Sequence, residues 1–217
     1  MSQQHLTTLA LALSLATTTT LAAPAKMAAG PIPPAEYETR VQQATSDPKS
    51  VAAGKRAAFL CVYCHGEDGN SVQANIPNLA GQHPVYLLTQ IEKFGDGRRN
   101  DAFMSGLIKS LSHADRVNMA VYYASMSARP ARTADPALVE RGRKRYQATC
   151  VGCHGASATG QKSIARLAGQ QASYLTLALA GYRDSKGTRS DPVMTPVARQ
   201  LAGEDIPALA AYLSTLK

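Results

Sequence analysis

Hydrophobic and polar positions along the chain follow a helical pattern that occurs twice. Each copy opens after an Asp-Pro pair, at Asp47 and at Asp135, where Asp suits the helix N-cap and Pro the first helical position. A second helical stretch follows, and each copy closes with an apolar helix, over residues 111–124 and 201–213. The pattern predicts an all-α fold built from one helical unit that is repeated.

The two copies stay in register along their length. Cys61 and Cys150 lie 89 residues apart, and Met104 and Met194 lie 90 residues apart. Because unrelated features hold one spacing to within two residues, we interpret the chain as a duplication of one domain. The predicted division is a signal peptide over 1–25, an extension or linker over 26–46, a first domain over 47–127, a linker over 128–135 and a second domain over 136–217.

The first 25 residues have the composition of an export signal. They contain no Asp, Glu, Lys or Arg, and an Ala/Leu/Thr stretch over 6–21 is followed by small residues. We therefore expect a secretory signal peptide cleaved near Ala23 or Ala25 and a periplasmic mature protein; a disordered Ala/Thr tail is the alternative. No later segment approaches the roughly 20 apolar residues of a membrane-spanning helix, so we expect at most peripheral membrane contact.

The segment from Lys26 to Ser46 is rich in Ala and Pro and has little periodicity. A short helix around Glu36 to Gln43 is its one predicted element. We interpret the segment as an extension or linker and assign it no function.

Large core-filling side chains are scarce, because the chain has no Trp and three Phe. A domain of under about 100 residues is near the lower limit for a stable apolar core and often needs a metal, a disulfide or another covalent staple. The composition therefore indicates that each domain folds around a bulky group that the sequence does not encode.

All four cysteines lie in two near-copies of one hexapeptide, C-V-Y-C-H-G at 61–66 and C-V-G-C-H-G at 150–155. A C-x-x-C pair alone allows a redox disulfide, half of a zinc site or a haem attachment point. Helical flanks disfavour the redox pair, and a zinc site leaves the following histidine unexplained. C-x-x-C-H is the haem c signature, in which two thiols form thioethers and the histidine binds iron. We predict two covalently bound haem c groups, held by Cys61, Cys64, His65, Cys150, Cys153 and His154.

Each predicted haem iron needs a second axial ligand. Between residues 128 and 217 the chain has one methionine, Met194, and no histidine besides the one in the motif. The register then selects Met104 as its counterpart in the first domain. Four other residues could bind this iron. We interpret Met119 and Met126 as packing residues and His113 as a helix-start residue. His83 has no histidine or methionine counterpart in the second copy.

Ligation by histidine and methionine suits electron transfer better than catalysis. A soft thioether favours ferrous iron, and two filled axial positions leave no open site for a substrate. We therefore expect an electron carrier and not an enzyme. The less favoured alternatives are a dihaem peroxidase, which needs a five-coordinate iron, and a haem sensor, which needs a labile ligand.

Several motifs together resemble the cytochrome c4 family of dihaem class I c-type cytochromes: the two C-x-x-C-H-G motifs, the paired L-A-G-Q at 79–82 and 167–170, the late methionine of each half and the closing L-S/A-x-x-D helix. The resemblance covers residues 47–217. It implies two tandem class I cytochrome c domains related by a pseudo-twofold axis, with haem propionate edges near the domain interface. It also implies a periplasmic location and electron transfer to a terminal oxidase or a similar acceptor.

The resemblance also implies where helices cross. In such folds the first and last helices of each domain cross, with a small residue packed against an aromatic one. The pair Gly54 and Tyr122 and the pair Gly142 and Tyr212 occupy suitable positions. We therefore expect these two glycines at the crossings.

The two copies differ in ways that predict unequal haems. Pro77 resembles the proline whose carbonyl accepts a hydrogen bond from the haem-binding histidine, and the second copy has Ala165 there. Residues 26–127 carry ten basic and nine acidic side chains, whereas residues 128–217 carry thirteen and six, a net charge of +7. A basic surface can steer an acidic protein partner, with plain solubility as the alternative, and export argues against a nucleic acid partner.

The predicted function is single-electron transfer between respiratory redox partners. The donor would be a quinol-oxidising complex or a dehydrogenase, and the acceptor a terminal oxidase or a reductase. The nearest alternative is a dihaem subunit bound to a dehydrogenase, such as the cytochrome subunit of a flavin-containing sulfide dehydrogenase. The chain itself carries no flavin-binding or other catalytic motif.

Overall fold

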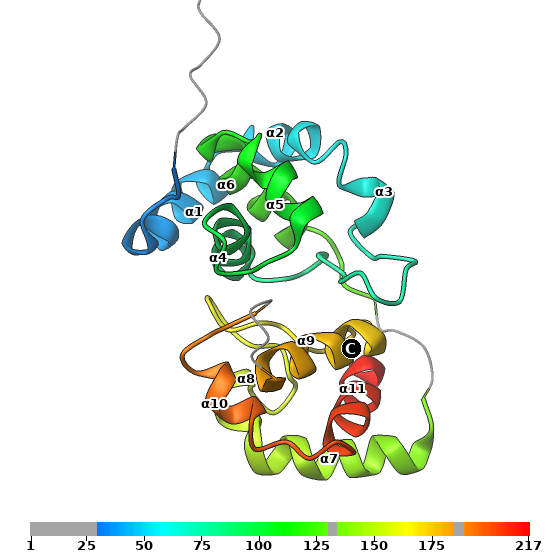
Figure 1. Cartoon of the computed structure of the whole chain (residues 1–217). Helices are drawn as coiled ribbons and strands as arrows, with labels where there is room; N and C mark the ends of the chain where they lie inside the picture. The colour runs from blue at the N-terminus through cyan, green and yellow to red at the C-terminus, as the bar shows by residue number, and fades with distance from the viewer. Residues whose placement is uncertain (1–29, 130–133, 185–188) are drawn as a thin grey trace, which may run out of the picture.

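A computed structural model of the chain describes residues 30–129, 134–184 and 189–217. Over these ranges every regular element is helical, and extended pairing is limited to isolated bridges. Figure 1 shows two helical domains, one above the other. The predicted signal peptide lies outside the described residues, and among those that are described no helix is both long and apolar enough to cross a membrane.

The same order of helices builds both domains. In the first domain the helices are α2 (Ser50–Ala57), α3 (Val62–His65), α4 (Pro84–Gly95), α5 (Ala102–Lys109) and α6 (His113–Ala124). In the second they are α7 (Pro136–Thr149), α8 (Val151–His154), α9 (Ala172–Asp184), α10 (Met194–Ala198) and α11 (Asp205–Thr215). The first domain adds a 3-10 helix, η1 (Pro34–Glu36), and α1 (Tyr37–Ser46) at its start. The predicted all-α duplication is confirmed.

One predicted helix start is confirmed and the other is wrong by two residues. α7 begins at Pro136, and the Asp135 carboxylate accepts a backbone N–H of its first turn at 2.8 Å. α2 instead begins at Ser50. The Asp47 carboxylate accepts the Lys49 N–H at 2.9 Å and so closes a turn ahead of the helix. The same Asp-Pro pair therefore caps a helix in one copy and a preceding turn in the other.

The first and last helices of each domain cross at a glycine, as expected. A Cβ added at Gly54 of α2 would lie 2.7 Å from the Cβ of Tyr122 in α6. A Cβ added at Gly142 of α7 would lie 2.8 Å from that of Tyr212 in α11. In both cases the added atom would also meet a backbone carbonyl of the facing helix. Only glycine therefore lets these helices approach as closely as they do.

The segment interpreted as an extension or linker packs against the first domain over its described part. Its predicted helix is present as α1, which contacts α4 and α6 and buries Tyr37 and Val41. The Ile32 N–H donates to the Glu92 carboxylate at 2.9 Å, and this fully buried carboxylate pairs with Arg116 at 3.2 Å. Residues 30–46 therefore form an additional layer of the first domain.

Each domain has its own hydrophobic core. The first core includes Tyr123 and Leu88, and the second includes Tyr146 and Leu209; all four side chains are almost fully buried. One cysteine of each hexapeptide packs against the core of its own domain. The predicted haem-binding residues therefore lie at the edge of each core.

Candidate functional site

Each cysteine motif folds as a single helical turn. In α3 the His65 N–H donates to the Cys61 carbonyl at 2.9 Å, and in α8 the His154 N–H donates to the Cys150 carbonyl at 3.0 Å. Each turn ends at the glycine of the motif, with φ of 84° and 78°, a conformation that residues with a side chain rarely adopt. The motif thereby places two thiols and one imidazole on one turn.

Each domain contains a mainly apolar cavity beside its cysteine motif. The first cavity has a volume of about 440 Å³, and its lining includes Cys61, Cys64, His65 and Met104. The second has a volume of about 490 Å³, and its lining includes Cys150, Cys153, His154 and Met194. The structure therefore brings the eight predicted site residues together as two sets of four.

The alternative axial ligands are placed differently. The His83 Nε2–H donates to the Thr159 carbonyl at 2.8 Å, and the His113 Nε2–H donates to the backbone of the N-terminal segment at 2.7 Å. Neither histidine lines either of these two cavities, and Met126 does not line them either. Met119 is buried in the core of the first domain and also lines the first cavity. Of the four alternatives, Met119 is the one that lines either of these two cavities.

A backbone carbonyl orients each imidazole. The His65 Nδ1–H donates to the Pro77 carbonyl at 2.9 Å, and the His154 Nδ1–H donates to the Ala165 carbonyl at the same distance. The change from proline to alanine therefore leaves this hydrogen bond in place. Burial lowers the pKa of both imidazoles, which keeps them neutral at pH 7. A neutral ring with Nδ1–H bonded has Nε2 available for a metal.

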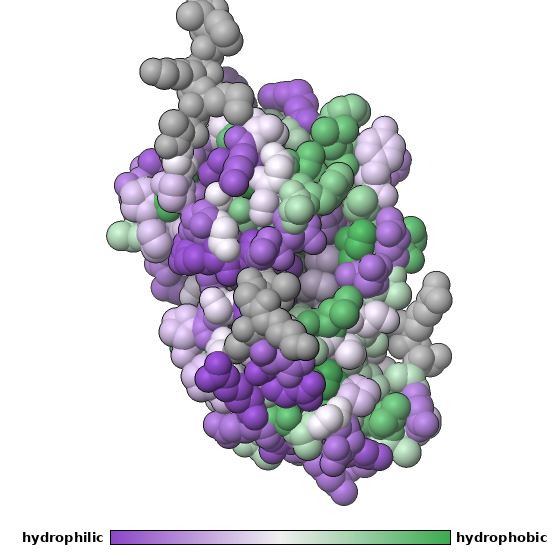
Figure 2. Space-filling model, in the orientation of Figure 1, coloured by the Kyte–Doolittle hydropathy of each residue, from purple (hydrophilic) through white to green (hydrophobic). Residues whose placement is uncertain are grey.

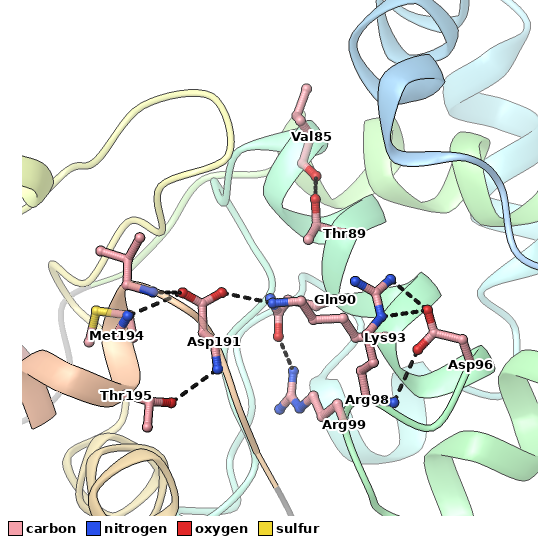
Figure 3. A network of polar contacts seen from close by, with 11 residues as sticks. Val85, Thr89, Gln90, Lys93, Asp96, Arg98, Arg99, Asp191, Met194 and Thr195 are labelled. Atoms are coloured by element: carbon pink, nitrogen blue, oxygen red, sulfur yellow. Dashed lines mark hydrogen bonds and ion pairs between the residues drawn. The ribbon is translucent and has the colours of Figure 1, made fainter. Parts of the chain in front are cut away.

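An aspartate fixes the start of each helix that carries a candidate methionine. Asp101 accepts the Met104 N–H at 2.9 Å, and Asp191 accepts the Met194 N–H at 3.1 Å. Asp191 also pairs with Lys93 of α4 at 2.8 Å, across the domain interface (Figure 3). The start of α10 is therefore tied to the first domain.

The two cavities share a positively charged wall at the domain interface. Arg99, Tyr174 and Arg189 line both cavities, and the two guanidiniums donate to the Tyr174 hydroxyl at 3.2 and 2.8 Å. Burial alone would raise the pKa of Tyr174, but the two arginines outweigh it and lower that pKa to about 7. Within the described ranges neither arginine pairs with a carboxylate. The wall therefore suits a ligand that brings carboxylates of its own.

The residues present fit one covalently bound haem in each cavity better than they fit zinc or a redox disulfide. The four thiols are free and are divided between two cavities, so they do not form one zinc site. Burial raises the pKa of the Cys150 thiol to about 11, the opposite of the lowered pKa of a redox-active cysteine. Apolar walls, a neutral imidazole, a thioether and a positive rim match the ring, iron and propionates of a haem.

Sequence reasoning missed two glutamines that join the two domains. The Gln82 side chain accepts the Arg166 N–H at 2.8 Å and donates to the Arg166 carbonyl at 2.9 Å. The Gln170 side chain makes the same two bonds to Asn78, at 2.8 and 2.9 Å. Both glutamines are buried and end the paired L-A-G-Q motif. The signal available in the sequence was the recurrence of a polar residue at the same register.

Comparison with known proteins agrees with this site. The sequence pattern of the cytochrome c family matches residues 51–127 and again residues 139–217. Cytochrome c4 of Pseudomonas aeruginosa is 36% identical over 179 residues, which cover 76% of this chain and 88% of that protein. The thiosulfate dehydrogenase electron acceptor of Thiomonas intermedia is 34% identical over 182 residues, which cover 77% of this chain and 83% of that protein.

Solved structures give the same family. Reduced recombinant cytochrome c4 from Pseudomonas stutzeri matches with a TM-score of 0.72 and 33% identity, over 77% of this chain and 98% of that chain. Thiosulfate dehydrogenase from Marichromatium purpuratum matches with a TM-score of 0.69 and 30% identity, over 77% of this chain and 40% of that chain. Two cytochrome c domains bind two covalent haem c groups. The chain therefore belongs to the cytochrome c4 family of dihaem electron-transfer cytochromes, and it is an electron carrier and not an enzyme.

Proposed function

We propose that the protein is a periplasmic shuttle that passes single electrons between respiratory redox proteins through two haems with His/Met ligation. His65 and Met104 would hold the iron in the first domain, and His154 and Met194 would hold it in the second. The thioethers form at Cys61, Cys64, Cys150 and Cys153. The observation that supports this assignment most is a recurrence: in both domains a buried histidine, two thiols and the methionine at the matching register line one cavity, to which Met119 also contributes in the first domain.

The protein's own groups hold the ligands so that electron transfer needs little rearrangement. A bound haem supplies a reversible one-electron ferric/ferrous couple. The Pro77 and Ala165 carbonyls fix the two imidazole rings, and Asp101 and Asp191 fix the start of the methionine-bearing helices. Soft thioether sulfur would favour the ferrous state, and binding of iron by both a histidine and a methionine would leave a substrate no free position on it.

The wall between the cavities supports electron exchange within the chain. Arg99, Tyr174 and Arg189 contribute to both linings, so the two centres are neighbours across the domain interface. The two guanidiniums also offer charge-assisted hydrogen bonds to propionates, which hold a carboxylate more strongly than neutral donors do. An electron accepted by one domain can therefore pass to the other before it leaves the protein.

Substitution of the two methionines tests the ligand assignment. Met104→Ala and Met194→Ala are each expected to remove about half of the sulfur-to-iron charge-transfer band of the ferric protein, because each cavity then lacks its thioether. Met126→Leu, outside both cavities, is the matched control and should leave the band whole. If Met119→Leu halved the band while Met104→Ala left it intact, Met119 would be the ligand in the first domain.

A dehydrogenase partner is the second candidate function. It is favoured by the similarity to a thiosulfate dehydrogenase electron acceptor and to a thiosulfate dehydrogenase structure. Isolation from native periplasm separates the two functions. Recovery of a free dihaem protein supports the shuttle, whereas stable co-purification with a dehydrogenase subunit supports a dihaem subunit of an enzyme complex.

The periplasmic location rests on the export-signal composition of residues 1–25. Amino-terminal sequencing of the protein from a periplasmic extract tests it. The mature chain is expected to start just after Ala23 or Ala25. Recovery of a haem-containing chain that still begins at Met1 in the cytoplasmic fraction would contradict the proposal.

A further inference from the structure

We propose that the haem-binding histidine of each domain is positioned by a glutamine of the other domain, which acts through a single peptide group. The inference rests on His65 and His154 binding iron, as proposed above. It goes further by naming Gln82 and Gln170 as positioning residues and by giving the route through which each domain influences the other domain's iron.

The peptide group between Pro77 and Asn78 connects the first histidine to the second domain. Its carbonyl oxygen accepts the His65 Nδ1–H at 2.9 Å. Its N–H donates to the Gln170 side-chain oxygen at 2.8 Å. In a trans peptide the C=O and N–H point in opposite directions, so one rigid plane carries a bond to the first domain's histidine on one side and to the second domain on the other.

The pseudo-twofold counterpart has the same geometry. The carbonyl of the Ala165–Arg166 peptide accepts the His154 Nδ1–H at 2.9 Å, and the N–H of this peptide donates to the Gln82 side-chain oxygen at 2.8 Å. Each domain therefore supplies the glutamine that supports the other domain's histidine. We refer to these two arrangements, His65–(Pro77–Asn78)–Gln170 and His154–(Ala165–Arg166)–Gln82, as the crossed relays.

Each glutamine holds both backbone groups of the residue that donates the relay N–H. The Gln170 side-chain nitrogen donates to the Asn78 carbonyl at 2.9 Å, and the Gln82 side-chain nitrogen donates to the Arg166 carbonyl at 2.9 Å. Gln82 is 6% exposed and Gln170 is 7% exposed, so water cannot easily replace either amide. These two carbonyls belong to the peptide groups that follow the relay peptides, so each glutamine fixes Asn78 or Arg166 on both sides and limits rotation of the relay peptide before it.

The relay predicts a direction of tuning. An acceptor on the peptide N–H polarises the group and makes its carbonyl a stronger acceptor. A stronger bond to Nδ1–H makes the imidazole more basic toward iron, which stabilises the ferric state and lowers the reduction potential. Loss of Gln170 should therefore raise the potential of the first domain's haem, and loss of Gln82 should raise that of the second.

A neighbouring glutamine provides the matched control. The Gln171 side chain also crosses the interface, where it donates to the Ser71 carbonyl at 2.5 Å and more weakly to the Asn78 side chain at 3.4 Å. Within the described residues its side chain makes no hydrogen bond to either relay peptide group, and its backbone N–H, which donates to the Gln170 side-chain oxygen at 3.0 Å, is kept in a Gln171 variant. Gln171→Leu therefore removes an interdomain hydrogen bond while leaving both crossed relays intact.

The experiment compares the holoprotein with Gln170→Leu, Gln82→Leu and Gln171→Leu. The two haems are distinguished by their ferric haem-methyl resonances, and the midpoint potential of each is measured. Gln170→Leu should raise the potential of the first haem and shift the ferrous His65 Nδ1–H resonance upfield, with the second haem unchanged. Gln82→Leu should show the reverse pattern. Gln171→Leu should leave both haems at their wild-type values.

A shift confined to the haem of the mutated domain, an equal shift in Gln171→Leu, or no shift in either relay variant would overturn the proposal. Hydrogen exchange of backbone amides in the wild-type holoprotein tests the proposal even if a variant fails to fold. The Asn78 and Arg166 N–H groups should exchange slowly, because each is bonded to a buried glutamine. Fast exchange of either would contradict the proposal. A wild-type protein without two haems or without the sulfur-to-iron band would instead overturn the proposed function, so the two failures are distinguishable.

Discussion

The two domains share one helical plan but are supported differently. The first has an additional layer, α1, attached through the buried Glu92 and Arg116. The second has no such layer among its described residues, and the start of its methionine-bearing helix, α10, depends on the first domain through the pair of Lys93 and Asp191. The corresponding Asp101 in the first domain is exposed and caps α5 without a salt bridge to the second. Duplication has therefore produced two methionine-bearing helices with different support, one held within its own domain and one tied to its neighbour.

The surfaces of the two domains differ as well. Figure 2 shows hydrophobic residues gathered on the upper part of the first domain, and exposed hydrophobic side chains of this domain include Phe59, Leu60 and Phe103, the last of them 66% exposed. Tyr63, between the two cysteines of the first hexapeptide, is also exposed, and its counterpart in the second is Gly152. The second half of the chain carries most of the net positive charge. A partner would therefore meet an apolar surface on one domain and a basic one on the other.

The largest expected effect concerns the support that only the first domain has. Glu92→Ala leaves Arg116 buried without its carboxylate and also removes the acceptor of the Ile32 N–H. Breaking a buried pair by removing one partner costs about 3–5 kcal/mol in the free energy of unfolding. Denaturant unfolding of the holoprotein should show this loss in the first domain and not in the second. Glu140→Ala, at the exposed pair with Arg143, is the control and should change little.

The next largest effect concerns the helix crossings, which the two domains share. Gly54→Ala and Gly142→Ala each place a Cβ against the facing helix, and such overpacking costs about 1–3 kcal/mol or more. We expect comparable losses in thermal stability from the two variants, one in each domain. A large loss from one and none from the other would show that the helix crossings are not equivalent.

A smaller effect should distinguish the two methionine-bearing helices. Lys93→Gln removes the ion pair that ties Asp191 to the first domain, and a partly exposed pair is worth about 1 kcal/mol, or about fivefold in an equilibrium constant. Exogenous imidazole should then displace the methionine of the second domain about fivefold more readily. The first domain should keep its wild-type imidazole affinity, and Lys93→Arg should restore the second. An equal change in imidazole affinity in both domains would show that the pair of Lys93 and Asp191 does not support the second domain alone.

The smallest effect concerns the basic second half. If its charge steers an acidic electron acceptor, the second-order rate of electron transfer should fall as ionic strength rises, because salt screens charges separated by more than about 10 Å at 0.1 M. Stopped-flow kinetics over a range of salt concentrations measures this. A flat response would leave solubility as the role of these charges and the apolar surface around Phe103 as the docking face.

The parts of the fold that could be predicted depend on short, local patterns. The hexapeptides and the register of Met104 and Met194 follow from spacing within one copy or between copies, whereas the helix-crossing glycines were expected from the family resemblance. The start of α2 was wrong because an Asp-Pro pair caps a helix or a turn equally well, and nothing local decides between them. The packing of α1 had a signal in the apolar positions 37, 41 and 44, which share one helix face.

The contacts between the domains could not be predicted from one sequence. Gln170 lies 92 residues from Asn78, and Asp191 lies 98 residues from Lys93. A glutamine amide or a lysine at such positions fits a solvated surface as well as an interface. Only the three-dimensional arrangement shows that the end of the L-A-G-Q motif reaches the peptide behind the other domain's histidine.

The most direct test of the central claim, two unequal His/Met-ligated haems in one chain, is a redox titration of the purified holoprotein followed in the visible spectrum. The account predicts two one-electron waves with different midpoint potentials and a ferric spectrum with the sulfur-to-iron band. A single one-electron wave, two indistinguishable centres, or a ferric spectrum without that band would contradict it.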